Sequence, residues 1–330
     1  MTLPESAQDI MRCPICKATL SLTDQQAECR SKACKAVFPI VDGVPILLDE
    51  KNSVFSFADF PKPKVAQTSL FTAVKNFVVK YLPSLDLNLS GQANMRQLSD
   101  LLFEQAELPV ILNIGGKHPT SACAQLCARP DVVCYESDVM LRPRTNLIAD
   151  PGNLPFADAS VDLVLIDGVL EHLLEPFIVA DEIHRVLKDD GLVYSDTPFM
   201  LQVHGGAIDF FRFSHLGHRR LFRRFKEISS GITSGPGVAL AYSIQYFLLS
   251  FGRSRTARFL VKAFCRLTLF WLKYIDFILV KRPGALDAAH GLYFMGRKSN
   301  ISIPDHELIA SYEGISPDLY KLTKADLARR

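Results

Sequence analysis

The chain lacks the segments that would carry it into or across a membrane. No apolar run approaches the roughly 18 to 20 residues of a spanning helix, and no basic stretch leads into a secretory apolar core. It also lacks an excess of charge, since 37 Lys and Arg stand against 35 Asp and Glu in 330 residues. The nearly balanced charge therefore gives no indication that the protein binds nucleic acid. These absences predict a cytoplasmic protein, and the length predicts two or more structural units.

A glycine turn follows an apolar run in the middle of the chain. The run 109–114 ends at Gly115 and Gly116, where backbone without side chains lets a ligand approach closely. A second apolar run, 132–135, ends in Glu136, 21 residues after Gly115. This is close to the roughly 20-residue offset at which an acidic side chain meets a ribose in dinucleotide-binding folds. The sequence predicts a parallel α/β domain that binds a nucleoside-bearing cofactor.

Further strand and helix signals follow in order. An apolar run ends at Asp150, the buried run 161–166 leads into Asp167, and a helical pattern precedes the strand-like run 192–195. The stretch LPFADASVDLVLIDGVLEHL…EIHRVLKDDGLVYSDTPF resembles the class I S-adenosylmethionine-dependent methyltransferases, over roughly residues 105–230. The resemblance implies a Rossmann-like α/β sheet with helices on both faces, a methyl-transfer activity and S-adenosylmethionine as cosubstrate.

The resemblance also implies which residues hold S-adenosylmethionine. Gly115 and Gly116 match the glycine loop under the methionine half, and Glu136 matches the acid that binds the ribose. Asp150 matches the acid that receives the adenine amino group. Asp167 lies where the family closes the cofactor site beside the substrate.

The glycine loop departs from the family pattern. Asn113 stands where an aspartate is usual, and Lys117-His118-Pro119 replaces the third glycine. We expect Lys117 or His118 to pair with the carboxylate of the cosubstrate. A degraded loop without catalytic activity is the alternative. The predicted cofactor-binding residues are Asn113, Gly115, Gly116, Lys117, Glu136, Asp150 and Asp167.

Four of the eight cysteines form two pairs near the N-terminus. Cys13 and Cys16 are separated by two residues, Cys29 and Cys34 by four, and the pairs lie twelve residues apart. Four thiolates at such spacing predict a structural zinc ion with a closed coordination shell. Disulfides are the alternative, which a reducing compartment disfavours. Asp42-Gly43 between two β-branched runs predicts a hairpin. Together these features resemble the zinc-ribbon domain known as an activator of RNA and protein methyltransferases.

The segment 204–214, HGGAIDFFRFS, carries polar side chains among aromatic rings. It follows the fifth predicted strand and so lies at the carboxyl edge of the sheet. It is similar to an H…DYYRFT segment in a subset of class I methyltransferases, many of them associated with polysaccharide biosynthesis. We expect His204, Asp209 and Arg212 to face the methyl acceptor. The alternative is that Asp209 and Arg212 form a pair that stabilises the fold. Ser214 is predicted to cap the next helix.

Methyl transfer depends mainly on positioning, because the sulfonium carbon is already electrophilic. A base is needed only for a poor nucleophile such as a sugar hydroxyl. His172 and His204 are the candidate bases, since a neutral imidazole accepts a proton near neutral pH. For His172 a capping or packing role is the alternative. The predicted catalytic residues are His172, His204, Asp209 and Arg212.

Residues 238–280 are predicted to interrupt the last antiparallel strand pair, which runs FKEISSGIT before them and GLYFMGRK (291–298) after them. On a helical projection the charged residues occupy an arc of about 80° and leave a wide apolar face. The charged residues are Arg258, Lys262, Arg266, Lys273 and Asp276. This pattern predicts contact of the 238–282 insertion with an anionic membrane surface. Burial against the domain or in a homodimer is the alternative.

The sequence thus predicts five segments and one activity. The segments are a zinc ribbon (1–50), a linker with an amphipathic helix (51–95), a methyltransferase core (96–236), a helical insertion with the final strand (237–298) and a loosely held polar tail (299–330). We expect a cytoplasmic methyltransferase, peripheral on the inner face of a membrane, that acts on a glycan or lipid-linked precursor. An RNA methyltransferase is the second hypothesis, with nucleic acid the less favoured partner, and a non-catalytic scaffold is the third.

Overall fold

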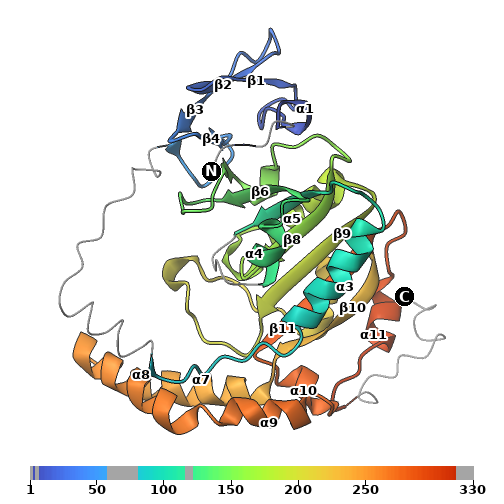
Figure 1. Ribbon diagram of the computed structural model, residues 1–330. Coiled ribbons are helices and arrows are strands. Elements are labelled where there is room, and N and C mark those ends of the chain that lie inside the picture. Colours follow the sequence, from blue (N-terminus) through green and yellow to red (C-terminus); the bar gives the residue numbers. More distant parts are fainter. Residues whose placement is uncertain (1–2, 4–6, 58–80, 116–121, 317–330) are drawn as a thin grey trace.

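The computed structural model describes residues 3, 7–57, 81–115 and 122–316, and the described strands join in one mixed sheet (Figure 1). The order across this eleven-stranded sheet is β1-β2-β3-β4-β7-β6-β5-β8-β9-β11-β10. The strands are β1 (Leu20–Leu22), β2 (Gln26–Cys29), β3 (Val37–Val41), β4 (Val44–Leu47), β5 (Val110–Ile114), β6 (Val133–Asp138), β7 (Leu147–Ala149), β8 (Val161–Asp167), β9 (Leu187–Pro198), β10 (Phe225–Ser234) and β11 (Gly291–Lys298).

The centre of the sheet is parallel. β7, β6, β5, β8 and β9 pair in parallel, and β9, β11 and β10 pair antiparallel at one end. The first six residues of β8 are all buried, as expected of a strand with helices on both faces. The chain runs from β5 through β6 to β7 and then returns to β8 on the other side of β5. This reversal creates a switch point between β5 and β8, where open α/β sheets bind ligands.

Alternate residues of the central strands serve two helical layers. Leu163 and Leu165 of β8 pack in the cluster that contains residues of α3 and α4. Val164 and Ile166 pack in the cluster that contains residues of α5 and α6. The helices of the core are α3 (Gly91–Phe103), α4 (Ala122–Cys127), α5 (Pro176–Val186) and α6 (His215–Leu221). Ser214 caps α6 by accepting a hydrogen bond from the backbone N–H of Gly217, as predicted. The predicted Rossmann-like fold is confirmed.

The N-terminal unit extends the core sheet by four strands and begins with α1 (Ala7–Ile10). β4 pairs with β7 in parallel, with Ile46 opposite Ile148. The edge strand of the core is therefore covered. Between β3 and β4, Asp42 and Gly43 both have positive φ, 52° and 79°. This geometry confirms the predicted hairpin.

The loop around the first two cysteines also binds the core directly. Lys17 Nζ donates to Asn153 Oδ1, and Asn153 Nδ2 donates to the backbone oxygen of Pro14. The backbone N–H of Arg12 donates to the oxygen of Pro155. These contacts fall on η2 (Pro151–Asn153) and the residues after it. The N-terminal unit and the core thus form one continuous body at this end of the molecule.

A helical insertion separates β10 from β11, as predicted, and lies at the end of the molecule opposite the N-terminal strands (Figure 1). Its helices are α7 (Pro236–Leu249), α8 (Arg255–Leu269), α9 (Leu272–Leu279) and α10 (Gly284–Asp287). The predicted common arc of charged residues is wrong for its last two members, because Lys273 and Asp276 are buried. Asp276 accepts hydrogen bonds from Gly237 N (2.6 Å) and Val238 N (3.1 Å) at the start of α7. Those N–H groups have no partner within α7, so the carboxylate turns inward.

In the described part of the segment after β11, up to residue 316, the chain forms a helix that contacts the core. Residues 305–310 form α11 (Asp305–Ala310), and Arg220 of α6 pairs with Asp305. Arg219 also donates to the hydroxyl of Ser311. Residues 58–80 of the predicted linker with an amphipathic helix (51–95) lie outside the described residues. Among the described residues no helix is long and apolar enough to span a membrane.

Candidate functional site

The predicted glycine turn lies at the switch point. Gly115 follows β5 with φ of +80°, a conformation that favours glycine, and its N–H donates to the oxygen of Ser137 (2.7 Å). A Cβ on Gly115 would stand 2.1 Å from Cγ2 of Val169, which follows β8. Only glycine therefore fits between these two strand ends. The other predicted loop residues, Gly116 and Lys117, and His118 with them, lie outside the described residues.

Glu136 is buried at the carboxyl end of β6 and holds three hydrogen bonds. Asn113 Nδ2 donates to Oε2 (2.9 Å), and Arg144 donates from Nη2 (2.5 Å) and Nε (3.1 Å) to Oε1. An aspartate in place of Asn113 would put a second negative charge against Glu136, whereas the amide donates to it. The departure from the family pattern at Asn113 thus has a physical reason.

Asp150 directly follows β7 and shapes the turn that comes next. It caps η2 by accepting from Gly152 N (2.9 Å), and Ser53 Oγ donates to its Oδ2 (2.5 Å). Ser53 belongs to the segment that follows β4. The N-terminal part of the chain therefore contacts a residue that the family resemblance assigns to adenine binding.

Asp167 and Asp196 lie side by side at the ends of β8 and β9. Gly168 N donates to the backbone oxygen of Asp196 (3.0 Å), and Thr233 Oγ1 donates to its carboxyl (3.1 Å). Burial, together with the charge of Asp167, raises the pKa of Asp196 well above its usual range. A second acid beside Asp167 was not predicted from the sequence. The carboxyl ends of these strands are thus rich in acidic groups.

His172 and His204 meet at Glu171. Nε2 of His172 lies 3.7 Å and Nε2 of His204 3.5 Å from Oε1 of Glu171, and the two rings are 5.3 Å apart. Nδ1 of His172 is 2.7 Å from the oxygen of Ile208, which can only accept. In the neutral ring Nδ1 of His172 therefore carries the proton and Nε2 the lone pair. Both predicted base candidates are brought together, around a buried carboxylate that was not predicted.

Asp209 and Arg212 build the loop that carries His204. Asp209 accepts hydrogen bonds from the backbone N–H groups of His204 (2.7 Å) and Gly205 (3.1 Å), and Arg212 pairs with it. Arg212 also donates to the oxygens of Leu201 and Gln202. The Arg212 guanidinium holds the pKa of Asp209 well below its usual range. These contacts favour the structural alternative for the pair, whose effect on the site is to position His204.

Several side chains of this region escape prediction from sequence because their partners belong to other elements of the fold. Arg144 pairs with Glu136, Val169 packs on Gly115, and Gly205 adjoins His172. A Cβ on Gly205 would stand 2.4 Å from Cε1 of His172. The one available signal was the pair Glu171-His172 itself, in which the acid precedes the histidine.

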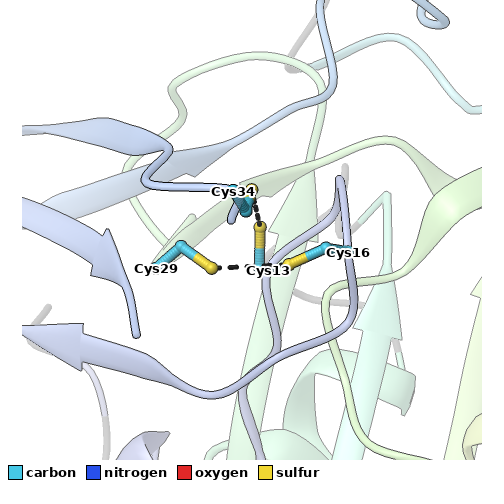
Figure 2. A group of neighbouring side chains, drawn as sticks. All are labelled: Cys13, Cys16, Cys29 and Cys34. Atoms are coloured by element: carbon cyan, nitrogen blue, oxygen red, sulfur yellow. Dashed lines mark hydrogen bonds between the residues drawn. The ribbon is translucent and has the colours of Figure 1, made fainter. Parts of the chain in front are cut away.

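The four N-terminal cysteines converge with their sulfur atoms facing one another (Figure 2). Sγ of Cys13 lies 3.9 Å from that of Cys34, and Sγ of Cys16 lies 3.4 Å from that of Cys29. A tetrahedral ion with Zn–S bonds of about 2.3 Å requires S–S separations of roughly 3.8 Å. A disulfide requires about 2.05 Å, and all eight cysteines are free thiols. The donor set therefore fits a zinc ion and does not fit disulfides.

The parallel sheet, the switch point and the acids at the strand ends define a class I methyltransferase domain. Comparison with known proteins agrees: residues 115–195 match the methyltransferase domain family and residues 8–43 match the Trm112p-like protein family. The N-terminal part is 46% identical over 43 residues to a UPF0434 protein of Azotobacter vinelandii, which is 13% of this chain and 70% of that protein. A UPF0434 protein of Ectopseudomonas mendocina is 42% identical over 43 residues, again 13% of this chain and 70% of that protein.

The chain thus contains a methyltransferase domain, and its N-terminal part belongs with the Trm112p-like and UPF0434 proteins. Solved structures with similar folds include the [4+2]-cyclase SpnF, at 16% identity and a TM-score of 0.40, with 70% of this chain and 93% of that chain covered. Another is the complex between the Haloferax volcanii Trm112 methyltransferase activator and a putative methyltransferase, at 16% identity and a TM-score of 0.39, with 64% and 96% covered.

Proposed function

We propose that this methyltransferase methylates an oxygen of a glycan or lipid-linked precursor at an anionic membrane surface. The observation that carries the proposal is the cluster of Glu171, His172 and His204. Glu171 and His172 follow β8 and His204 follows β9, and Val169, which adjoins Gly115, lies two residues before Glu171. Side chains that take up a proton thus adjoin the place where the family binds its methyl donor.

In this proposal the cosubstrate lies along the carboxyl ends of β5, β6 and β7. Glu136 binds the ribose, Asp150 the adenine amino group, and Asp167 closes the site beside the acceptor. Asn113 acts through its hydrogen bond to Glu136. Gly115 lets the donor approach the backbone, and by resemblance alone we assign Gly116 and Lys117, which lie outside the described residues, to the methionine half of the donor.

The proposed chemistry needs a proton acceptor because a sugar or lipid hydroxyl is a poor nucleophile. The acceptor oxygen attacks the methyl carbon of the sulfonium in line, and the electron pair of the breaking C–S bond stays on sulfur. The acceptor proton leaves to the cluster of Glu171, His172 and His204. Nε2 of His172 has its lone pair available and is buried without a hydrogen-bond partner. Asp209 and Arg212 hold the loop so that His204 faces this point.

Exposed apolar side chains around His204 support an acceptor with an apolar part. Met200, Val203, Ile208 and Phe210 belong to the same loop, and each is more than two fifths exposed. A polar centre with an apolar rim suits an acceptor that combines a hydroxyl with a lipid. This combination favours the lipid-linked precursor over a free sugar.

The exposed face of α8 supports contact with a membrane. Leu260, Phe264 and Leu267 recur at helical spacing and are 60%, 57% and 58% exposed, and Trp271 continues the strip at 51%. On the opposite side of the helix, Arg255, Arg258 and Lys262 are also exposed. An apolar face backed by basic residues is typical of a helix that lies in the plane of an anionic bilayer surface. Lys273, one of the predicted headgroup contacts, is excluded because its Nζ donates to the oxygen of Ser84 (2.6 Å).

We also propose that Cys13, Cys16, Cys29 and Cys34 hold one structural zinc ion, since their sulfur geometry fits its tetrahedral shell. The ion would fix the knuckle from which Lys17 reaches Asn153 of the core. We further propose that the segments of the chain are divided at residues 50, 95, 236 and 298, as the sequence predicts.

Calorimetric titration with S-adenosylmethionine and transfer of a radioactive methyl group test the proposal. We expect one binding site per chain, and label in the lipid fraction when a cell extract is the acceptor source. Label confined to RNA would favour the nucleic-acid hypothesis, and no binding of S-adenosylmethionine would favour the scaffold.

Membrane contact is tested by co-sedimentation with anionic liposomes. We expect binding that weakens at high salt and is lost in Phe264→Ser/Leu267→Ser. Ile301→Ser is the matched control, because Ile301 is 79% exposed but lies after β11, outside the insertion. Equal binding to zwitterionic liposomes would contradict the role of the basic residues, and a stable homodimer without lipid binding would assign the face to a second copy.

A further inference from the structure

Three potential ligand atoms converge between η3 (Leu170–His172) and the loop 201–212. They are Oε1 of Glu171 and the Nε2 atoms of His172 and His204. One such atom from each residue lies within 4.8 Å of the others. The spacing suits a single ion, since metal bonds of about 2.0 to 2.2 Å place neighbouring ligands roughly 3 to 3.6 Å apart. The two separations from Glu171 are 3.5 and 3.7 Å, so the second lies just above this range.

The cluster also contains buried acceptors without donors. Oε2 of Glu171 and Nε2 of His172 have no hydrogen-bond partner, and Glu171 is 1% exposed. A buried carboxylate oxygen beside two imidazole nitrogens is unfavourable unless a positive charge stands among them. Glu171 and His172 thus each keep one buried acceptor atom without a hydrogen bond, and a cation beside them would supply the missing partner.

The outer ring nitrogens are held as in metal-binding histidines. Nδ1 of His172 donates to the oxygen of Ile208. Nδ1 of His204 lies 3.3 Å from Asp209 Oδ2, which can accept its proton, and 3.4 Å from Arg212 Nη2, which can only donate, while Nε2 is the nitrogen that faces Glu171. Histidines that bind metals are commonly fixed in this way through the nitrogen that does not coordinate. The backbone adds to it, because Phe210 N and Phe211 N donate to the backbone oxygen of Glu171.

We propose that Glu171, His172 and His204 bind a divalent transition-metal ion whose open positions take oxygen atoms of the methyl acceptor. Two imidazoles and one carboxylate are donors that suit Zn²⁺, Fe²⁺ and Mn²⁺. The role in catalysis rests on the proposed function. The O–H bond of the coordinated acceptor breaks and its proton passes to Oε2 of Glu171. The oxygen then forms the new bond to the methyl carbon, and the C–S electron pair remains on sulfur. With the metal bound, the two histidines act as its ligands, and Glu171 alone accepts the proton of the acceptor.

Gly205 is the positioning residue of this site. The close approach of its backbone to Cε1 of His172 leaves no room for a side chain. Gly205→Ala is therefore expected to push the ring of His172 away from Glu171 and to weaken metal binding without removing a ligand.

The experiment uses the full chain and Zn²⁺ alone. Protein is dialysed against micromolar Zn²⁺, and zinc per chain is measured by elemental analysis in wild type, His204→Ala and His306→Ala. We expect His204→Ala to hold one ion fewer than wild type. His306→Ala should match wild type, because His306 is exposed on α11 and far in sequence from the cluster. His204 lies in an exposed loop, so its removal should not disturb the fold. Gly205→Ala should need more Zn²⁺ to reach the same loading.

Equal zinc content in wild type and His204→Ala would overturn the metal site. S-adenosylmethionine binding is measured on the same samples and should be unchanged in His204→Ala. Wild type that binds S-adenosylmethionine but shows no zinc difference would leave the proposed function standing and remove the metal. A failure to bind S-adenosylmethionine would instead remove the proposed function, whatever the zinc content.

Discussion

Glu136→Gln tests the ribose contact, and the structure sets the size of its effect. A carboxylate offers about four lone-pair positions. Arg144 uses two on Oε1 and Asn113 one on Oε2, so one position remains for a ribose hydroxyl. One charge-assisted bond contributes about 1.5 to 3 kcal/mol, or roughly 10- to 150-fold in Kd for S-adenosylmethionine.

The assay is isothermal titration of wild type, Glu136→Gln and Arg144→Met with S-adenosylmethionine. Arg144→Met frees two positions on Glu136, so its affinity should not fall. Asp131→Asn removes an equal charge at the surface, where Asp131 pairs with Arg129, and is the matched control. In the double variant Glu136→Gln/Arg144→Met the guanidinium that would lose its carboxylate partner is removed as well. This variant should bind S-adenosylmethionine as weakly as Glu136→Gln. Unchanged affinity in Glu136→Gln would refute the assignment of Glu136 to the ribose.

Three further predictions concern the zinc ion, the backbone and pH. Cys16→Ser should lose the ribbon zinc in elemental analysis while circular dichroism retains the signal of the core, and a full zinc complement would contradict the four-thiolate shell. Gly115→Ala should lower the free energy of unfolding, measured in urea, by about 1 to 2 kcal/mol because of the positive φ at this position. The clash of the new methyl group with Val169 should lower it further, and adding Val169→Ala should restore this second part of the loss. Burial lowers the pKa of His218 from 6.5 to about 3, so the unfolded chain binds a proton between these pH values that the folded chain does not. Stability should therefore fall as pH decreases from 6.5, by about 2 kcal/mol at pH 5 from this group, and His218→Gln should remove that part of the slope.

The helices and strands can be predicted from local sequence because burial on one or two faces produces a periodic pattern of apolar residues. The apolar run at 161–166 lies within β8, and GLYFMGRK matches β11 at both ends. Asp42-Gly43 specifies its hairpin through backbone conformation alone. Such signals need no knowledge of distant partners, and so they predicted the fold class correctly.

The details of the site depend on contacts between distant residues. The role of Glu171 becomes evident only from its contact with His204. Asp276 turns inward to accept a hydrogen bond at the start of α7, which is far from it in sequence. Helical periodicity placed Asp276 on an exposed arc because a projection cannot show which neighbour packs there. The function of Asn113 likewise becomes evident only beside Glu136 across two paired strands.

The pairing of β4 with β7 has a consequence for how this protein responds to dilution. A strand supplied by a separate chain occupies its partner's edge according to concentration, and the pairing weakens as the complex is diluted. Here both strands belong to one chain, so the local concentration of β4 at β7 is fixed by the tether between them. The covered edge should therefore persist at any protein concentration, and losing it requires breaking the contacts themselves.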